Sequence, residues 1–222
     1  MKNIVLASVA LFGSSFLFAQ EKVNIGDFNT LKVYDKIPVE LVASSKNYVE
    51  LEGLNADDIK LENTSGELRV KLTGTKILQG DGSNVIVHYK SLQDIQASQG
   101  SKIHSDDTLK ASKLNITSNE GSSVKLPVSA KNLEVKINSG GEVILSGTAN
   151  VQTVVANSGG KYYSKTLKAE NSTLTTNAGG YIEATSTESV DAKTRAGGVI
   201  DIYGKPAQRN QKKVVGGKIN FK

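Results

Sequence analysis

Side chains that could carry catalysis or hold a metal are few and scattered in this chain of 222 residues. It has two histidines, His88 and His104, and no cysteine. Neither histidine has a third ligand at metal spacing, so we expect both to be solvated strand residues. Without cysteine, nucleophilic catalysis would need a Ser or Thr beside a base, and no Gly-x-Ser-x-Gly elbow is present. The sequence therefore predicts no catalytic, metal-binding or cofactor-binding residues.

Two acidic pairs, Asp57-Asp58 and Asp106-Asp107, could offer oxygen ligands to calcium. Calcium loops space their oxygen ligands at alternate positions, and calcium-binding β-helices carry them in a nonapeptide repeat. Neither pair has such a spacing, so we expect no calcium site.

A repeat of about 19 residues must position most of the side chains after residue 95. A glycine, usually doubled, returns with an apolar residue three positions after it, and polar and apolar residues alternate on both sides. This alternation predicts two short strands per repeat, each with one buried face. The first glycines of the repeats are Gly100, Gly121, Gly140, Gly159, Gly179, Gly197 and Gly216.

Strands that recur at this period without hairpin turns are expected to stack in parallel, coil on coil, at ~4.8 Å. A single coil cannot bury its inner face, but a stack of coils forms a continuous core. Apolar residues alternate at every second position, and the coil length varies. Both features favour a right-handed β-helix over a left-handed β-helix built from hexapeptide repeats. The predicted fold class is all-β, a right-handed parallel β-helix of about 19 residues per coil with an irregular β N-terminal capping section.

An asparagine stands two positions before the corner glycine in four repeats. Asparagine tolerates the left-handed backbone and can hydrogen-bond to its own copy in the next coil. We interpret these residues as corner chemistry, with a ligand site as the less favoured alternative. They are Asn119, Asn138, Asn157 and Asn177.

The chain divides into three segments. Residues 1–20 have the positive start, apolar run and small residue of a secretory signal peptide, with Lys2 and Ala19 at its two ends. Residues 21–94 alternate like strands but lack the paired glycines, and residues 95–222 form the repeated coils. We expect an exported protein, in the periplasm or at the cell surface, with no transmembrane segment.

The formal net charge of +5 comes mostly from lysines that are interleaved with Glu and Asp. No dense basic run with interleaved aromatic residues is present, so no nucleic-acid partner is expected. A weak attraction to acidic surface glycans stays open.

Outward positions after the corner glycines supply a candidate binding face. Exposed aromatic rings on a rigid sheet can stack on sugar rings or meet an apolar patch of a partner. The alternative is that these side chains only pack between coils and stiffen the sheet. The candidate face consists of Ile144, Lys161, Tyr163, Tyr181 and Tyr203.

Three segments carry a resemblance to a known family. They are Phe28-Asn29-Thr30-Leu31-Lys32-Val33 with Pro38-Val39-Glu40-Leu41, then Gly66-Glu67-Leu68-Arg69-Val70, then Ile202-Tyr203-Gly204-Lys205-Pro206. With the Gly-Gly coils between them, they resemble the GIN domain described as an autotransporter-adhesin head. The resemblance covers about residues 27–219. It implies a secreted β-helical protein of Bacteroidota-type bacteria, with adhesion suggested by name and no established catalytic residues.

The sequence thus favours an exported, non-enzymatic binding module, adhesin-like, with an unknown glycan or protein ligand. One alternative is a polysaccharide-acting β-helix enzyme, although the short coils leave no room for cleft-forming loops. The other is a structural subunit that assembles by end-to-end stacking. Lys212, Lys213 and Lys218 would guard the last coil against such stacking, so a monomer or weak oligomer is expected.

Overall fold

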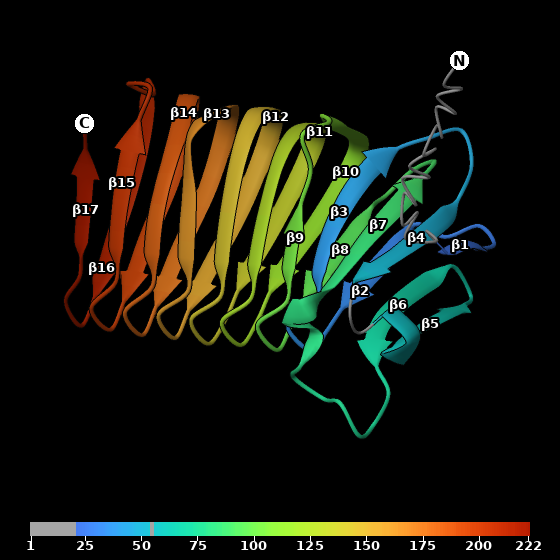
Figure 1. The fold of residues 1–222 in the computed structure, drawn as a ribbon. Helices are drawn as coiled ribbons and strands as arrows, with labels where there is room; N and C mark the ends of the chain where they lie inside the picture. The colour runs from blue at the N-terminus through green and yellow to red at the C-terminus, as the bar shows by residue number, and fades with distance from the viewer. Residues whose placement is uncertain (1–20, 54–55) are drawn as a thin grey trace, which may run out of the picture.

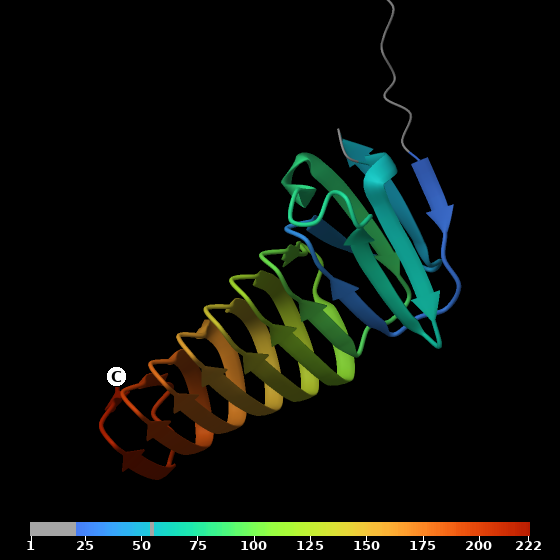
Figure 2. The same ribbon diagram turned by 90° about the horizontal axis from the view of Figure 1, so that it is seen from below.

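The computed structural model describes residues 21–53 and 56–222, so the expected signal peptide lies outside the described residues. Figure 1 shows a column of stacked coils that leads from an N-terminal β section to the C-terminal coil, and Figure 2 shows the same column from below. The column has about 7 turns with a spacing of about 19 residues. The predicted fold class, an all-β right-handed parallel β-helix, is confirmed.

Each repeat leaves its glycine corner along one side of the column, bends at a second corner and returns along the other side. We call the outgoing side wall A and the returning side wall B. Four long strands cover both walls: β11 (Ser123–Ile137), β12 (Glu142–Asn157), β13 (Lys161–Asn177) and β14 (Tyr181–Arg195). Wall A also contains β9 (Lys102–His104), β15 (Val199–Tyr203) and β17 (Lys218–Phe221). Wall B also contains β8 (Asp94–Ala97), β10 (Leu109–Ser118) and β16 (Gln208–Val214).

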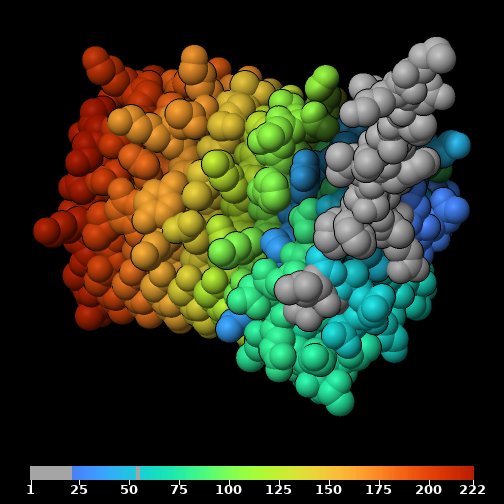
Figure 3. Space-filling model, viewed as in Figure 1, coloured from blue at the N-terminus to red at the C-terminus, as the bar shows by residue number. Residues whose placement is uncertain are grey.

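Equivalent residues of successive coils lie directly above one another, as the period predicted. In wall A one such row points into the column and closes its core. Stacked apolar rows of this kind give each coil the inner contacts that it lacks alone. The row is Ile103, Val124, Val143, Tyr162, Ile182, Ile200 and Ile219. In the space-filling view of Figure 3, side chains of adjacent coils meet and close the gaps seen between ribbons.

Each glycine corner is a tight turn with two consecutive left-handed residues, and the last corner adds a third, Gly217. In the turn that starts at Asn138, the amide of Gly141 donates to the Asn138 carbonyl at 3.0 Å. Ser139 and Gly140 have φ values of 51° and 73°, as a type I′ turn requires. The left-handed residues are thus the two that follow the asparagine, not the asparagine itself.

The asparagine side chains form the predicted ladder along the corner edge. Asn138 donates to Asn119 at 2.8 Å, Asn157 donates to Asn138 at 2.8 Å, and Asn177 donates to Asn157 at 2.7 Å. Each bond joins two neighbouring coils, so the ladder fixes the register of the corners.

The N-terminal section does not stack in chain order. The coil made by β2 (Thr30–Val33) and β3 (Pro38–Ala43) has β8 and β9 on one side. On its other side lie β6 (Glu67–Leu72) and β7 (Ser83–Tyr89), which come later in the chain. A later segment therefore covers an earlier coil. The division drawn between residues 94 and 95 falls inside β8 and stays a prediction.

Antiparallel strands complete the N-terminal end. β4 (Tyr48–Gly53) pairs with β7 and then with β1 (Glu21–Asn24), which extends wall A. β5 (Ile59–Thr64) pairs with β6 and extends wall B. Two single-turn 3₁₀ helices, η1 (Ala56–Asp58) and η2 (Gly80–Gly82), lie in the connections. The N-terminal section, predicted as an irregular β cap, thus contains both a parallel coil and antiparallel strands.

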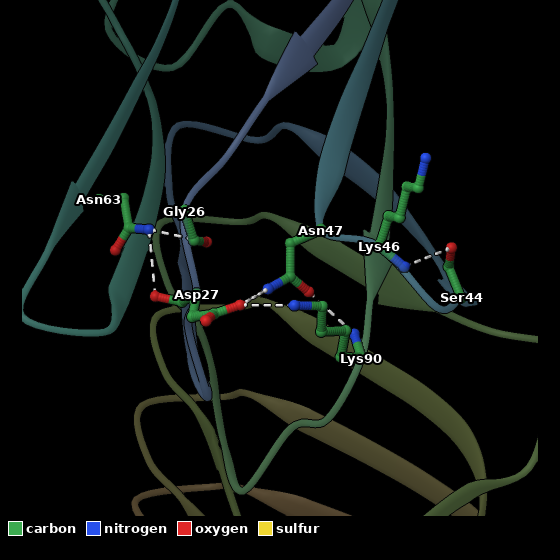
Figure 4. A network of polar contacts seen from close by, with 7 residues as sticks. All are labelled: Gly26, Asp27, Ser44, Lys46, Asn47, Asn63 and Lys90. Carbon is green, nitrogen blue, oxygen red and sulfur yellow. Dashed lines mark hydrogen bonds and ion pairs between the residues drawn. The ribbon is translucent and has the colours of Figure 1, made fainter.

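A polar network on the surface ties these capping segments together (Figure 4). Asp27 Oδ1 accepts hydrogen bonds from Asn47 Nδ2 at 3.1 Å and from Lys90 Nζ at 2.8 Å. Asn47 Oδ1 accepts the amide of Lys90 at 2.9 Å, and Asn63 Nδ2 donates to the Gly26 carbonyl at 3.1 Å. The hydrogen bond and charge of Lys90 lower the pKa of Asp27. The network therefore connects the loop after β1 with the ends of β5 and β7.

Candidate binding surfaces

All five residues of the predicted binding face lie on the outer side of wall A, in the C-terminal half of the column. Ile144 on β12 pairs with Tyr163 on β13, and Lys161 on β13 pairs with Tyr181 on β14. Tyr203 on β15 pairs with Thr185 on β14. We call Ile144, Lys161, Tyr163, Tyr181 and Tyr203 the tyrosine face. The parallel register brings them together from three consecutive coils and the start of the next.

The rings of the tyrosine face make specific contacts. The ring centres of Tyr163 and Tyr181 are 5.5 Å apart at an interplanar angle of 47°. This spacing lies in the range of favourable tilted aromatic pairs. The ammonium group of Lys165 lies 4.6 Å from the ring centre of Tyr203, within the range of a cation–π contact. All three tyrosines are half-buried, so each ring keeps part of its surface accessible.

Carboxylates surround the phenol groups of this face. The hydroxyl of Tyr181 donates to Asp201 Oδ2 at 3.2 Å. Burial, with the charges of Asp201 and Glu183, raises the pKa of Tyr181 to about 12. Loss of hydration, together with Glu183, also raises the pKa of Tyr203. Both phenols stay protonated at neutral pH and their oxygens can accept hydrogen bonds, so the face offers aromatic surface and hydroxyl groups together.

The two histidines differ from each other, and His104 stands on the same outward row of wall A as Ile144, two coils away. His104 is exposed, as predicted. The prediction of a solvated His88 is wrong, because its ring stacks on Tyr48 at 3.9 Å between centres and 8° between planes. Its Nε2 lies 3.4 Å from Glu50, whose other oxygen pairs with Lys22 at 2.8 Å. The pairing of β4 with β7, which the sequence did not predict, places these residues side by side.

In the second acidic pair, Asp107 has a structural role. Asp107 Oδ2 accepts the amide of Ala43 at 3.2 Å, which links the start of wall B to β3. Within the described residues, no three His, Asp or Glu side chains gather closely enough to hold a metal ion. Residues 21–53 and 56–222 also contain no helix of the length and apolar character needed to cross a membrane.

A second surface was missed by the sequence reasoning. A groove of about 660 Å³ runs along the second corner. Figure 1 shows that this corner forms the edge of the column opposite the glycine turns. Its signal in the sequence is an alanine that recurs between polar neighbours in four successive repeats. We call it the alanine groove, after the aligned residues of its floor: Ala111, Ala130, Ala149 and Ala169.

The whole architecture matches a known family. The model of the family described as "Putative auto-transporter adhesin, head GIN domain" matches residues 27–206. The chain belongs to the GIN-domain family. Among curated proteins, no significant match to this GIN-domain chain was found.

Solved structures share the fold of this GIN-domain chain at low sequence identity. A putative adhesin from Bacteroides fragilis is 20% identical, with a TM-score of 0.85, and the match covers 92% of this chain and 96% of that one. A putative adhesin from Parabacteroides merdae is 18% identical, with a TM-score of 0.72 and coverage of 91% and 94%. A protein from Parabacteroides distasonis named a putative lipid binding protein is 14% identical, with a TM-score of 0.68 and coverage of 91% and 96%. At these identities the likeness shows the fold alone.

Proposed function

We propose that this GIN-domain chain is an exported, non-enzymatic binding module of adhesin type, which acts in the periplasm or at the cell surface. The tyrosine face is its contact surface. The observation that carries the proposal is the grouping of three tyrosine rings, Ile144 and Lys161 on one rigid wall.

The composition of the face supports a ligand with both apolar and hydroxyl surfaces. Aromatic side chains bury a large area at small cost in conformational entropy, and their hydroxyls can still bond to a partner. Protonated phenols beside Glu183 and Asp201 suit the hydroxyl groups of a glycan or the polar backbone of a protein. The family name and the names of two structural neighbours support adhesion at the same general level.

The test is binding of the purified chain to a glycan array and to immobilised cell envelopes. We expect Tyr163→Ala with Tyr181→Ala to weaken binding by about tenfold or more, since loss of two aromatic contacts removes roughly 1–3 kcal/mol. Tyr34→Ala is the matched control, because Tyr34 is also half-buried but lies in the N-terminal section. Vesicles of defined lipid composition form a further arm, because one structural neighbour is named a lipid binding protein.

Equal binding by the double variant and the parent chain would rule out the tyrosine face as the contact surface. Depolymerisation of a glycan by the pure protein would contradict the non-enzymatic role. Circular dichroism of both variants shows whether a lost signal reflects lost structure.

A further inference from the structure

We propose that the alanine groove binds a linear polyanionic glycan, laid along the axis of the column. This surface lies at the second corner and shares no residue with the tyrosine face, so it goes beyond the proposed function. The inference rests on the order of the side chains on its rims and on their charge.

The first rim is a row in exact parallel register. Lys110 pairs with Ser129, Ser129 with Thr148, and Thr148 with Lys168. The alanines of the floor come next along each strand, and three of them are buried. The second rim then follows, made by Ser112, Lys131, Asn150 and Glu170.

The lysines of the rims are accessible to a ligand. Lys110, Lys131 and Lys168 are exposed, and within the described part of the chain none of them forms an ion pair. Glu170 is the acid among the lining residues, and its Oε1 accepts Asn150 Nδ2 at 3.0 Å. The groove therefore carries three cationic groups and one carboxylate, and this excess of positive charge attracts an anionic ligand.

The repeat of the coils sets the shape of a fitting ligand. Neighbouring rungs of the rim are ~4.8 Å apart, so the four rungs span roughly 14 Å along the axis. Ser129 and Thr148 place hydroxyl groups on the rungs between the two outer lysines of the first rim. An extended chain that carries negative groups separated by hydroxyl groups matches this order.

The floor and the lining distinguish a glycan from a nucleic acid. Single-stranded nucleic acids bind through aromatic side chains on which the bases stack. No aromatic residue is among the residues that line the groove. Alanine side chains leave the floor shallow and smooth, which suits the C–H faces of sugar rings.

The experiment measures the affinity of the chain for oligogalacturonate of defined length by isothermal titration calorimetry. Lys131→Gln with Lys168→Gln is expected to weaken binding by about tenfold, since two exposed charge contacts to the carboxylates of the ligand are lost. The matched control is Lys193→Gln with Lys212→Gln. It removes the same charge from stacked positions on the outer side of wall B.

Thr148→Tyr provides a second test without any change in charge. Thr148 is exposed, so a larger side chain there fills the groove from outside and leaves the core intact. We expect loss of oligogalacturonate binding with an unchanged melting temperature. Tyr163→Ala with Tyr181→Ala should bind oligogalacturonate like the parent chain, which separates this proposal from the proposed function.

Several results would overturn the proposal. Equal losses in the groove pair and the control pair would show a general charge effect. Equal affinity for a neutral glycan of the same length would remove the role of the lysines. Groove-dependent binding of a single-stranded oligonucleotide with the same affinity would show that the site does not select glycans.

Discussion

Gly179 and Gly180, the two glycines of one corner, serve different physical needs, although they look alike in the sequence. Gly179 has φ of +78° and open space around the position of a side chain. Gly180 has no such φ, but a Cβ atom there would lie 2.3 Å from the carbonyl oxygen of Ala156 in the preceding coil. The left-handed backbone explains why glycine occupies the first position, and the close approach of two backbones explains why it occupies the second. In an earlier coil Ser122 takes the second position, and its hydroxyl donates to the Ala97 carbonyl at 2.8 Å.

This difference gives a prediction for a pair of neighbouring substitutions. Gly179→Ala should lower the free energy of unfolding by about 1 kcal/mol, the penalty of a left-handed alanine. Gly180→Ala should lower it by about 3 kcal/mol, because the backbone of two coils must move apart and no new hydrogen bond compensates. Urea denaturation followed by circular dichroism measures both. Equal losses at the two positions would contradict the separate roles.

At the scale of elements, the interior of the column is less uniformly apolar than the repeat suggested. Tyr162 from wall A is fully buried, and its hydroxyl donates to Gln152 Oε1 of wall B at 3.2 Å. Gln152 Nε2 donates to Ser172 Oγ at 2.8 Å, and Ser172 in turn bonds to Ser186. Burial raises the pKa of Tyr162. This network joins the two walls across the core and connects three successive coils.

A double-mutant cycle tests the network. Tyr162→Phe should destabilise the chain by about 1–2 kcal/mol, because Gln152 Oε1 is left buried without its donor. Gln152→Leu added to that variant should recover part of the loss, since the unpaired oxygen is then gone. Midpoints of urea unfolding give the three differences. Strict additivity of the two substitutions would show that the pair does not interact.

The regular part of the fold could be predicted because each coil repeats the same two local features, a glycine turn and an alternation of buried and exposed residues. Glycine spacing placed the corners, alternation identified the inward row from Ile103 to Ile219, and outward parity placed Tyr163 beside Tyr181. The order of the N-terminal strands could not be predicted. The pairing of Leu31 with both Leu68 and Ile95 depends on contacts between distant segments that share no period. The groove was missed because alanine is uninformative between polar neighbours until the second corner is known.

At the scale of the whole molecule, the last coil differs from those before it. The inward positions of wall B are Val190, Ala192 and Thr194 on β14. The residues paired with them on β16 are Arg209, Gln211 and Lys213. The guanidinium group of Arg209 lies 4.9 Å from the ring centre of Phe221, over the apolar side of β17. Polar inward positions keep this end hydrated, and charged residues on an edge oppose the pairing of further strands.

Restoring apolar inward residues should promote association. Gln211→Leu with Lys213→Leu places apolar side chains on two inward rows at the end face, so we expect dimers or larger species that grow with concentration. Asn210→Leu with Lys212→Leu is the control, because those residues stand on the outward rows of the same strand. Analytical ultracentrifugation of both variants and the parent chain makes the comparison. A monomeric inward variant would show that other features of the coil prevent stacking.

The order of the N-terminal strands also bears on how the chain assembles in time. Most coils of the column pair with a segment about 19 residues away, so each new coil closes only a short loop onto the one before it. The coil of β2 and β3 is different, because all of its partner strands come later in the chain. It pairs with β6 and β7 on one side and with β8 and β9 on the other. Closing long loops is slow, and a chain that emerges from its N-terminus presents these strands first. We expect nucleation to require the first hundred or so residues together, after which the coils add rapidly in sequence toward the C-terminus.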